Sequence, residues 1–407
     1  MLKALRIRDF RLLWGGSLVS DLGSWLLVLA IPAHIFLTTG SLRATGLALA
    51  AQYLPLLVLG PVAGVFADRH DRRRLMIATN LFRAGAVAIM LLGTAPGHYW
   101  VLYVALVAES SGSVLYSPAA QALTPAIVGT GTLLSSANSL NAVSDGATRL
   151  IGGPLGGVLL TALGINWLIG ADVLSYLLSA AAMFMTSRPD TARSDHMTTI
   201  AGVGRDLVDG VRVLRRHPVT RALLPVTVLF AAANTSLSAV LIPWGVQRLG
   251  GTEHTGFVLS CLGAGFLIGA PVIRAGLDRA QPRNLLAVSL TATAAAFFLL
   301  FTSSTLATAL PAAVGIGLFG STCQVVPLTA MQRAIPDAIL GRVGAVFLTA
   351  EAAATLTGAM AGPFLAQAVH FTGVAAVASL VTLSAAALTF LTVPRMRLAL
   401  PVRWRAG

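Results

Sequence analysis

Residues 64–75 read GVFADRHDRRRL and place six charged side chains within seven consecutive positions of an otherwise apolar chain. Of the 407 residues, 56% are hydrophobic and only 11% are charged. That apolar share exceeds what the core of a water-soluble domain needs, and long apolar runs recur from end to end. The composition therefore predicts a membrane protein, and the charged stretch needs a separate explanation.

The apolar runs on both sides of this stretch are each about 20 residues or longer, which is enough to cross roughly 30 Å of hydrocarbon. They lack the period-two alternation of barrel strands, so they indicate helices, which satisfy their own backbone hydrogen bonds in lipid. We expect an all-α polytopic membrane protein with twelve transmembrane helices. The expected spans are 12–37, 44–67, 75–94, 99–122, 134–161, 166–187, 221–247, 255–277, 284–302, 305–331, 342–370 and 372–393.

The basic residues predict the orientation of these spans. With a cytoplasmic N-terminus, only Arg43 and Arg248 of the 28 lysines and arginines fall in outer loops, while Arg83 and Arg149 lie within spans. Such an excess in the inner loops follows the positive-inside rule. We expect a multi-pass protein of the cell membrane with both termini in the cytoplasm. The net charge of +13 follows from this topology, so no nucleic-acid partner is expected.

The first apolar run, within residues 1–37, is too long for a cleavable leader, and Asp21 and His34 interrupt it. We interpret it as the first span. The longest polar stretch separates six spans from six others. The expected division is an N-terminal six-helix bundle at 1–187, a cytoplasmic linker at 188–220 and a C-terminal six-helix bundle with a cytoplasmic tail at 221–407.

Short motifs recur between these two halves. Asp68-Arg69 returns 210 residues later as Asp278-Arg279, and Gln121 with Pro125 returns 211 residues later as Gln332 with Pro336. Two matches at nearly one offset indicate a duplication. Pairs of glycines one turn apart occur in the second and fifth spans of each half, where they would let helix backbones approach in a sliding contact between the bundles. These pairs are Gly60/Gly64, Gly152/Gly156, Gly265/Gly269 and Gly358/Gly362.

The charged stretch resembles the signature of the major facilitator superfamily: a glycine, three residues, Asp-Arg and a cluster of arginines. The resemblance implies that Gly64 permits close helix contact and that Asp68 holds a cytoplasmic gate. It also implies that Arg69, Arg72 and Arg73 pair with Asp68 or with the ends of neighbouring helices. Topology alone would explain the arginines but not the acid.

The stretch departs from the family pattern at Asp71, where a glycine is common. The second copy has Arg274 where its glycine would stand, so we expect that copy of the gate to be degenerate. Residues 10–25, 117–128 and 135–157 are similar to the branch that holds the enterobactin exporter and the macrolide efflux proteins. Within the last of these, GGPLGG is a shifted form of the glycine-proline motif of antiporters. The resemblance implies proton-coupled export of a siderophore, drug or natural product.

Polar groups inside a membrane are costly unless they are paired or reached by water, so they mark candidate sites. The span 134–161 carries polar and small residues spaced by three or four, which places them on one helical face. Asp145 and Arg149 lie one turn apart, and both an ion pair and a role in transport remain open. The face consists of Ser135, Asn138, Asn141, Asp145, Arg149, Gly152 and Gly156.

Glu109 is the leading candidate for a proton carrier, because it shares a face of its span with Gly112, Ser113 and Tyr116. The arginine that drug/proton antiporters usually have in this helix is absent, since Ala108 stands at its position. Two interpretations stay open. Glu109 either binds and releases a proton, or it remains ionised beside an arginine, of which Arg149 is one candidate.

Other intramembrane polar residues are weaker candidates for the proton or substrate pathway, because hydrogen bonding between helices is the commoner explanation of single polar residues. They are Asp21, Asn234, Ser238, Trp244, Gln324 and Glu351. The Arg83 side chain is long enough to reach the cytoplasmic surface, and Asp172 lies near the outer end of its span. We expect both residues to be structural.

The sequence contains no nucleophile elbow, phosphate loop or HExxH motif, and Cys261 and Cys323 lack the spacing of a metal site. We therefore expect a transporter without enzymatic activity, cofactor or metal, which uses a proton or other ion gradient. Its expected partners are a small-molecule substrate, the coupling ion and the lipid bilayer, and we expect a monomer. An uptake facilitator is an alternative. A non-transporting receptor or scaffold is less favoured, because no segment outside the spans is long enough for a sensory domain.

Overall fold

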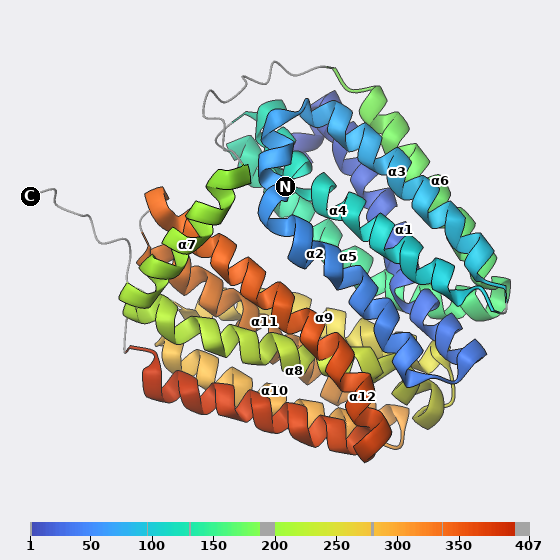
Figure 1. Ribbon diagram of the computed structural model, residues 1–407, viewed down its shortest axis with the longest axis vertical. Coiled ribbons are helices and arrows are strands. Elements are labelled where there is room, and N and C mark those ends of the chain that lie inside the picture. Colours follow the sequence, from blue (N-terminus) through green and yellow to red (C-terminus); the bar gives the residue numbers. More distant parts are fainter. Residues whose placement is uncertain are drawn as a thin grey trace, which may run out of the picture. The chain divides into compact units, whose positions relative to one another are not determined.

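The computed structural model describes residues 2–95, 97–129, 132–187, 200–277, 281–335 and 337–394. These ranges are helical apart from short connections, which confirms the all-α prediction (Figure 1). The elements are η1 Leu2–Arg6, α1 Arg8–Thr39, α2 Leu42–Arg69, α3 Arg72–Gly93, α4 Tyr99–Val128, α5 Thr132–Leu163, α6 Ile165–Phe184, α7 Ile200–Arg216, α8 Pro218–Arg248, α9 Thr252–Leu277, α10 Pro282–Thr302, α11 Leu306–Ala334 and α12 Asp337–Thr392.

Within the described ranges, nine helices are long and apolar enough to cross a membrane. The longest of them, α12, covers the last two expected spans, and its backbone leaves the helical region at Val369 and His370, where these spans meet. His370 has a φ of 57°, which turns the chain between the two spans. By contrast, α7 is amphipathic, with two arginines in its last turn, and lies within the expected linker 188–220.

The turn between α1 and α2 illustrates how local residues set the helix ends. Gly40 adopts a left-handed conformation with a φ of 63°, and its N–H donates to the carbonyl of Phe36 at 2.8 Å. Ser41 then caps α2 by accepting a hydrogen bond from the N–H of Ala44 at 3.2 Å. Glycine after one helix and serine before the next are the residues that such ends favour.

The first three helices of each half recur along the sequence at a constant interval. In the first half α1, α2 and α3 begin at residues 8, 42 and 72, and in the second half α8, α9 and α10 begin at residues 218, 252 and 282. Each pair is offset by 210 residues, the interval that separates Asp68-Arg69 from Asp278-Arg279. Asp278, Arg279 and Pro336 lie outside the described residues.

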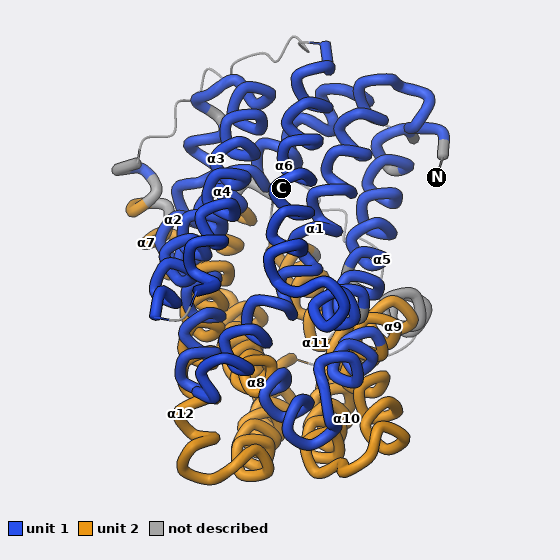
Figure 2. Tube along the Cα trace, turned by 90° about the vertical axis from the view of Figure 1, so that its right-hand side faces the viewer, with its two compact units in different colours: residues 1–203, 241–260 blue, residues 204–240, 261–407 orange. Residues whose placement is uncertain are grey.

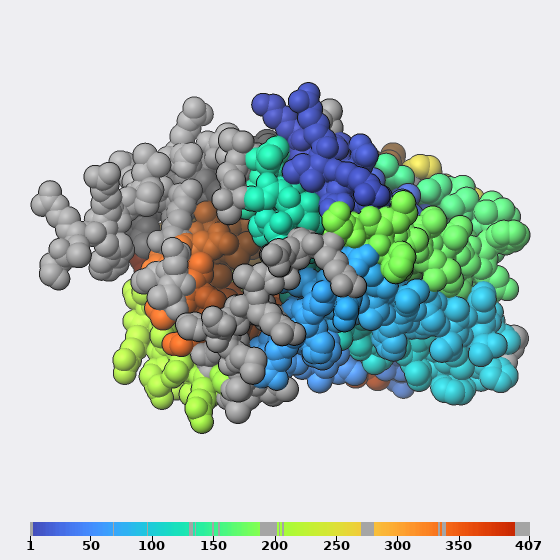
Figure 3. All heavy atoms as spheres, turned by 90° about the horizontal axis from the view of Figure 1, so that it is seen from above, coloured from blue at the N-terminus to red at the C-terminus, as the bar shows by residue number. Residues whose placement is uncertain are grey.

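Two compact units can be distinguished by their internal contacts: residues 1–203 with 241–260, and residues 204–240 with 261–407 (Figure 2). In the first unit α3 packs against α4 and α6, and α1 packs against α5 and α6. The side chains of α3 and α6, light blue and green, lie side by side in Figure 3. In the second unit α10 packs against α11 and α12. The bundle boundaries expected at residues 187 and 221 stay a prediction.

Two of the glycine pairs occupy equivalent contacts in the two units. On α5, a Cβ added to Gly156 would lie 2.5 Å from the carbonyl oxygen of Leu26 in α1, and one added to Gly152 would lie 2.5 Å from the Cβ of Trp25. On α12, Gly358 and Gly362 approach the backbone of α8 in the same way. The fifth and eleventh spans thus pack closely on the first and seventh.

The remaining two pairs differ from each other. Gly265 and Gly269 of α9 approach the backbone of α11, whereas a Cβ on Gly64 would meet no atom of the described residues within 4 Å. A Cβ on Gly60 would meet only Leu56 of its own helix. Three pairs therefore contact a helix of their own unit, and the sliding contact expected between bundles stays a prediction.

We expect Gly156→Leu to destabilise the first unit, because its side chain would collide with the α1 backbone, and overpacking typically costs about 1–3 kcal/mol or more. Gly170→Leu is the matched control, since Gly170 lies within α6 and a Cβ there meets nothing within 4 Å among the described residues. Thermal unfolding of the purified proteins in detergent measures both. Equal melting temperatures for the two variants would contradict this account of the α1–α5 contact.

Candidate functional site

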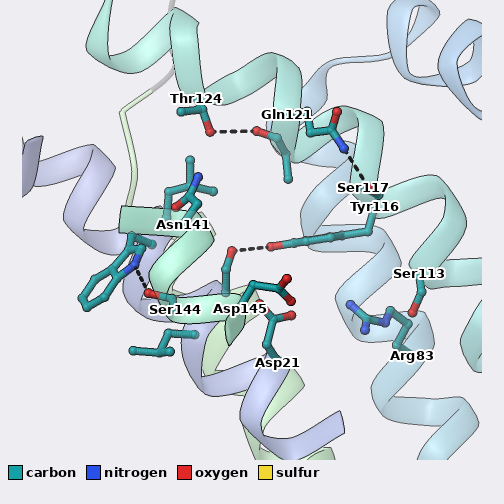
Figure 4. A pocket seen from close by; sticks show the side chains of 15 residues that line it. Asp21, Arg83, Ser113, Tyr116, Ser117, Gln121, Thr124, Asn141, Ser144 and Asp145 are labelled. Carbon is teal, nitrogen blue, oxygen red and sulfur yellow. Dashed lines mark hydrogen bonds between the residues drawn. The ribbon is translucent and has the colours of Figure 1, made fainter. Parts of the chain in front are cut away.

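A cavity of about 330 Å³ lies within the first unit between α1, α3, α4 and α5. Most of its lining side chains are polar, and Figure 4 shows them around the hollow. The polar ones are Ser17, Asp21, Arg83, Ser113, Tyr116, Ser117, Gln121, Thr124, Asn141, Ser144 and Asp145, and the apolar ones are Leu13, Trp14, Leu18 and Ala120. The volume falls at the lower end of the range for small-molecule sites.

Hydrogen bonds hold the two aromatic side chains of this cavity in place. The Tyr116 ring extends from α4 into the cavity, where its hydroxyl lies 2.9 Å from Ser17 Oγ of α1 (Figure 4). The indole N–H of Trp14 donates to Ser144 Oγ of α5 at 2.8 Å. Because their polar atoms are engaged, the rings present apolar surface at fixed positions among polar groups. Such a lining suits an amphipathic molecule.

At one edge of the cavity, Arg83 of α3 forms an ion pair with Glu109 of α4. Arg83 Nε lies 3.2 Å from Glu109 Oε1, and the two side chains are 7% and 16% exposed. The same carboxylate oxygen accepts hydrogen bonds from Tyr176 Oη at 2.8 Å and from Ser113 Oγ at 2.7 Å. Three donors converge on one oxygen, so this environment stabilises the ionised carboxylate.

Aromatic rings and polar side chains enclose the other partner, Arg83. Its guanidinium donates to Tyr176 Oη at 2.7 Å and lies over the rings of Tyr176 and Tyr116, at 4.1 and 5.5 Å from their centroids. Asn80, one turn earlier on α3, accepts from Arg83 at 3.5 Å and donates to Ser179 Oγ of α6 at 3.0 Å. Gly112 leaves room for the guanidinium stem, since a Cβ there would come within 2.6 Å of Arg83 Cγ.

Arg83 does not extend to a surface, because it is only 5% exposed and is paired inside the unit. The register of the α3–α4 hairpin contains a signal for this pairing that our sequence reasoning missed. Arg83 lies ten residues before α3 ends at Gly93, and Glu109 lies ten residues after α4 begins at Tyr99. Antiparallel helices joined by a short turn place such residues at equal depth.

The structure brings together only some of the candidates for the substrate and proton pathway. Asp21, Tyr116, Asn141 and Asp145 line the cavity. Glu109 does not belong to the lining residues, but it contacts two of them, Ser113 through a hydrogen bond and Arg83 through the ion pair. Asn138 is exposed on α5 outside the lining set, and Asn234, Gln324 and Glu351 lie on α8, α11 and α12 of the second unit.

The charged stretch between α2 and α3 forms a capped turn. Asp71, the residue that departs from the family pattern, caps α3 by accepting a hydrogen bond from the N–H of Arg74 at 2.8 Å. Arg73 donates to the carbonyls of Met183 and Phe184 at the C-terminal end of α6, where a cation favours the helix dipole. Arg72 donates to the carbonyl of Ala122 in α4 at 3.3 Å. The side chains of Asp68 and Arg149 lie outside what the structure describes.

The sequence matches the family model described as Major Facilitator Superfamily over residues 13–359 and again over residues 226–405. The chain belongs to the Major Facilitator Superfamily. It is therefore a multi-pass secondary transporter that binds a small molecule within the membrane, and it is not an enzyme.

Relatives with assigned names are distant. The chain is 26% identical over 356 residues to "Macrolide efflux protein A" of Streptococcus pyogenes, which covers 82% of this chain and 83% of that protein. It is 28% identical over 216 residues to "Lysophospholipid transporter LplT" of Salmonella heidelberg, which covers 53% of this chain and 52% of that protein.

Solved structures share the fold at low identity. A crystal structure of the nucleoside transporter NupG has a TM-score of 0.77 and 10% identity, with 94% of this chain and 99% of that chain covered. A crystal structure of the peptide transporter POT has a TM-score of 0.71 and 15% identity, with 94% of this chain and 95% of that chain covered. These likenesses establish the fold alone.

We expect Arg83→Met to cost about 3–5 kcal/mol of stability, because it leaves the Glu109 carboxylate buried without its counter-ion. The double variant Arg83→Met with Glu109→Gln removes both charges and should recover most of that loss. Unfolding temperatures of the two single variants and the double variant form a double-mutant cycle. Costs that simply add in the double variant would argue against an energetic link between the two side chains.

Proposed function

We propose that this transporter exports a small amphipathic molecule by alternating access and that an inward proton gradient drives the export. The observation that carries the proposal is the cavity of aromatic and polar side chains bordered by the Arg83–Glu109 pair. A cavity for the substrate and a titratable group at its edge are the two parts that such coupling requires. Transport into sealed vesicles with and without an imposed pH gradient tests it.

The cavity lining supports an amphipathic substrate. Trp14 and Tyr116 offer apolar faces, while Asn141, Gln121 and Asp145 offer hydrogen-bonding groups (Figure 4). The likeness to macrolide efflux proteins favours a macrolide-like drug or natural product over a siderophore. The GGPLGG motif, residues 152–157, favours export over uptake through its likeness to the antiporter motif.

Coupling can be explained through Glu109. Protonation of its carboxylate would remove the charge that attracts Arg83 and would weaken the hydrogen bonds that now converge on Oε1. A ligand or proton shifts a conformational equilibrium only when it interacts differently with the two conformations. The loss of an ion pair between α3 and α4 is such a difference.

The remaining parts of the proposal concern topology. Both termini lie in the cytoplasm, the two six-helix bundles span 1–187 and 221–407, and the protein acts as a monomer in the cell membrane. In this arrangement the α2–α3 turn lies on the cytoplasmic side, where Asp68, Arg69, Arg72 and Arg73 form the gate. The distribution of arginines supports this orientation.

We expect Glu109→Gln to abolish the dependence of accumulation on a pH gradient while substrate exchange continues, because exchange needs no net proton movement. Reconstituted vesicles permit both measurements on the same preparation. If Glu109 only anchors the helices, exchange and folded yield should fall together, and the residual transport should keep its pH dependence. Coupling at the wild-type level in the variant would eliminate the carrier role.

We expect Asp68→Asn to impair transport while leaving insertion intact, because it removes a charge that would favour one conformation of the gate. Asp71→Asn is the matched control, since it removes the same charge from the same turn and asparagine retains the helix cap. Transport is measured at equal amounts of inserted protein. Equal activity of the two variants would argue against a gate at Asp68.

A further inference from the structure

A second acid lies close to the Arg83–Glu109 pair, on α6. Asp172 is 1% exposed, and its carboxylate accepts one hydrogen bond, from Ser175 Oγ at 3.0 Å. Gly23 of α1 packs directly against this carboxylate. No ion pair of Asp172 exists within the described ranges. An ionised carboxylate in such a place, with a single donor and no counter-ion, is costly.

Arg83 and Glu109 both form hydrogen bonds with Tyr176, which lies one turn after Asp172 on α6. Arg83 lies on α3, which packs against α6, and Glu109 lies on α4, which packs against α3. The helices α1 and α5 also contact α6. Their acids are Asp9 in the first turn of α1, and Asp21 on α1 and Asp145 on α5, which both line the cavity. One arginine thus stands beside two buried acids. The three groups together are electrically neutral only when exactly one of the acids holds a proton.

Tyr176 connects the two acids through α6. It lies one turn after Asp172, and its hydroxyl donates to Glu109 and accepts a hydrogen bond from Arg83. Ser24, the residue after Gly23, has its Oγ 2.8 Å from the same hydroxyl. Asp172 lies seven residues after α6 begins and Glu109 ten residues after α4 begins. The cavity extends further along α4, through Tyr116 to Thr124. Along the helices the order is therefore Asp172, Glu109 and cavity.

We propose that Asp172 and Glu109 share one proton, with Arg83 as counter-ion to whichever of them is ionised. This inference rests on the proposed proton coupling and adds a second proton-binding residue to it. In the present conformation Glu109 is the ionised partner and Asp172 holds the proton. Transfer moves that proton from the Asp172 carboxyl to a Glu109 oxygen, breaks the Arg83–Glu109 pair and leaves Asp172 as the partner of Arg83. The net charge of the three groups does not change.

Infrared spectroscopy of the protein in lipid vesicles tests the proposal, because the C=O stretch of a protonated carboxyl is separate from carboxylate bands. We expect Asp172→Asn to remove one such band and Ser175→Ala to shift its frequency through loss of the hydrogen-bond donor. Asp209→Asn is the control, because the Asp209 side chain is 43% exposed and paired with Arg212, and it should leave the band unchanged.

The decisive variant is Glu109→Gln, in which Asp172 is intact. If the two acids share a proton, Asp172 takes the place of Glu109 as the partner of Arg83, ionises and loses its band. Retention of the Asp172 band in Glu109→Gln would overturn the proposal, as would an unchanged band in Asp172→Asn. Should Asp172→Asn fail to fold, the band shift in Ser175→Ala and its loss in Glu109→Gln still decide the question.

Transport in the same vesicles separates this proposal from the function on which it rests. If substrate accumulation by the wild-type protein does not depend on the pH gradient while the infrared results are as expected, the proposed proton coupling is wrong and the proposed proton sharing is supported. If accumulation follows the gradient and Asp172→Asn remains fully coupled, Asp172 takes no part in transport and the present inference fails.

Discussion

The buried ion pair between Arg83 and Glu109 is the interaction on which the interior of the first unit depends. Moving an arginine and a glutamate away from water costs several kcal/mol for each ion, and their attraction repays this only when the remaining hydrogen-bonding groups are satisfied. Tyr176, Ser113 and Asn80 satisfy them. Because these residues come from α3, α4 and α6, the requirement to surround one ion pair fixes how three helices meet.

The helices were predictable from the sequence because the length and polarity of an apolar run are local properties. The 210-residue interval was predictable for the same reason, since it is present in Asp68-Arg69 and Asp278-Arg279. The partner of Glu109 was not, because it depends on the register between α3 and α4. A helical face tells which residues of one helix lie together, and it leaves open which residue of the neighbouring helix stands opposite. The partners of the glycine pairs were unpredictable on the same ground.

The GGPLGG segment of α5 packs against two neighbouring helices, α1 and α9. Gly152 and Gly156 face α1, whereas a Cβ on Gly157 would lie 2.8 Å from the carbonyl oxygen of Thr252 at the start of α9. Two hydrogen bonds accompany the second contact, from Ser260 Oγ to the carbonyl of Leu150 and from Thr161 Oγ1 to Glu253. Each hydrogen bond contributes about 1 kcal/mol, in addition to the packing of Gly153 and Gly157 against α9.

The cavity and the ion pair share residues, which gives the site a direct route for coupling. Arg83, Ser113 and Tyr116 line the cavity, Ser113 also donates to Glu109, and Tyr116 stacks on Arg83. A molecule that takes the Ser113 hydroxyl for itself removes one of three donors from the Glu109 carboxylate and thereby changes how readily that carboxylate is protonated. By thermodynamic reciprocity, protonation of Glu109 changes the affinity for the molecule by the same factor. Under the proposed proton coupling, the substrate and the proton therefore need no long pathway between them, because the Ser113 hydroxyl both lines the cavity and donates to the Glu109 carboxylate.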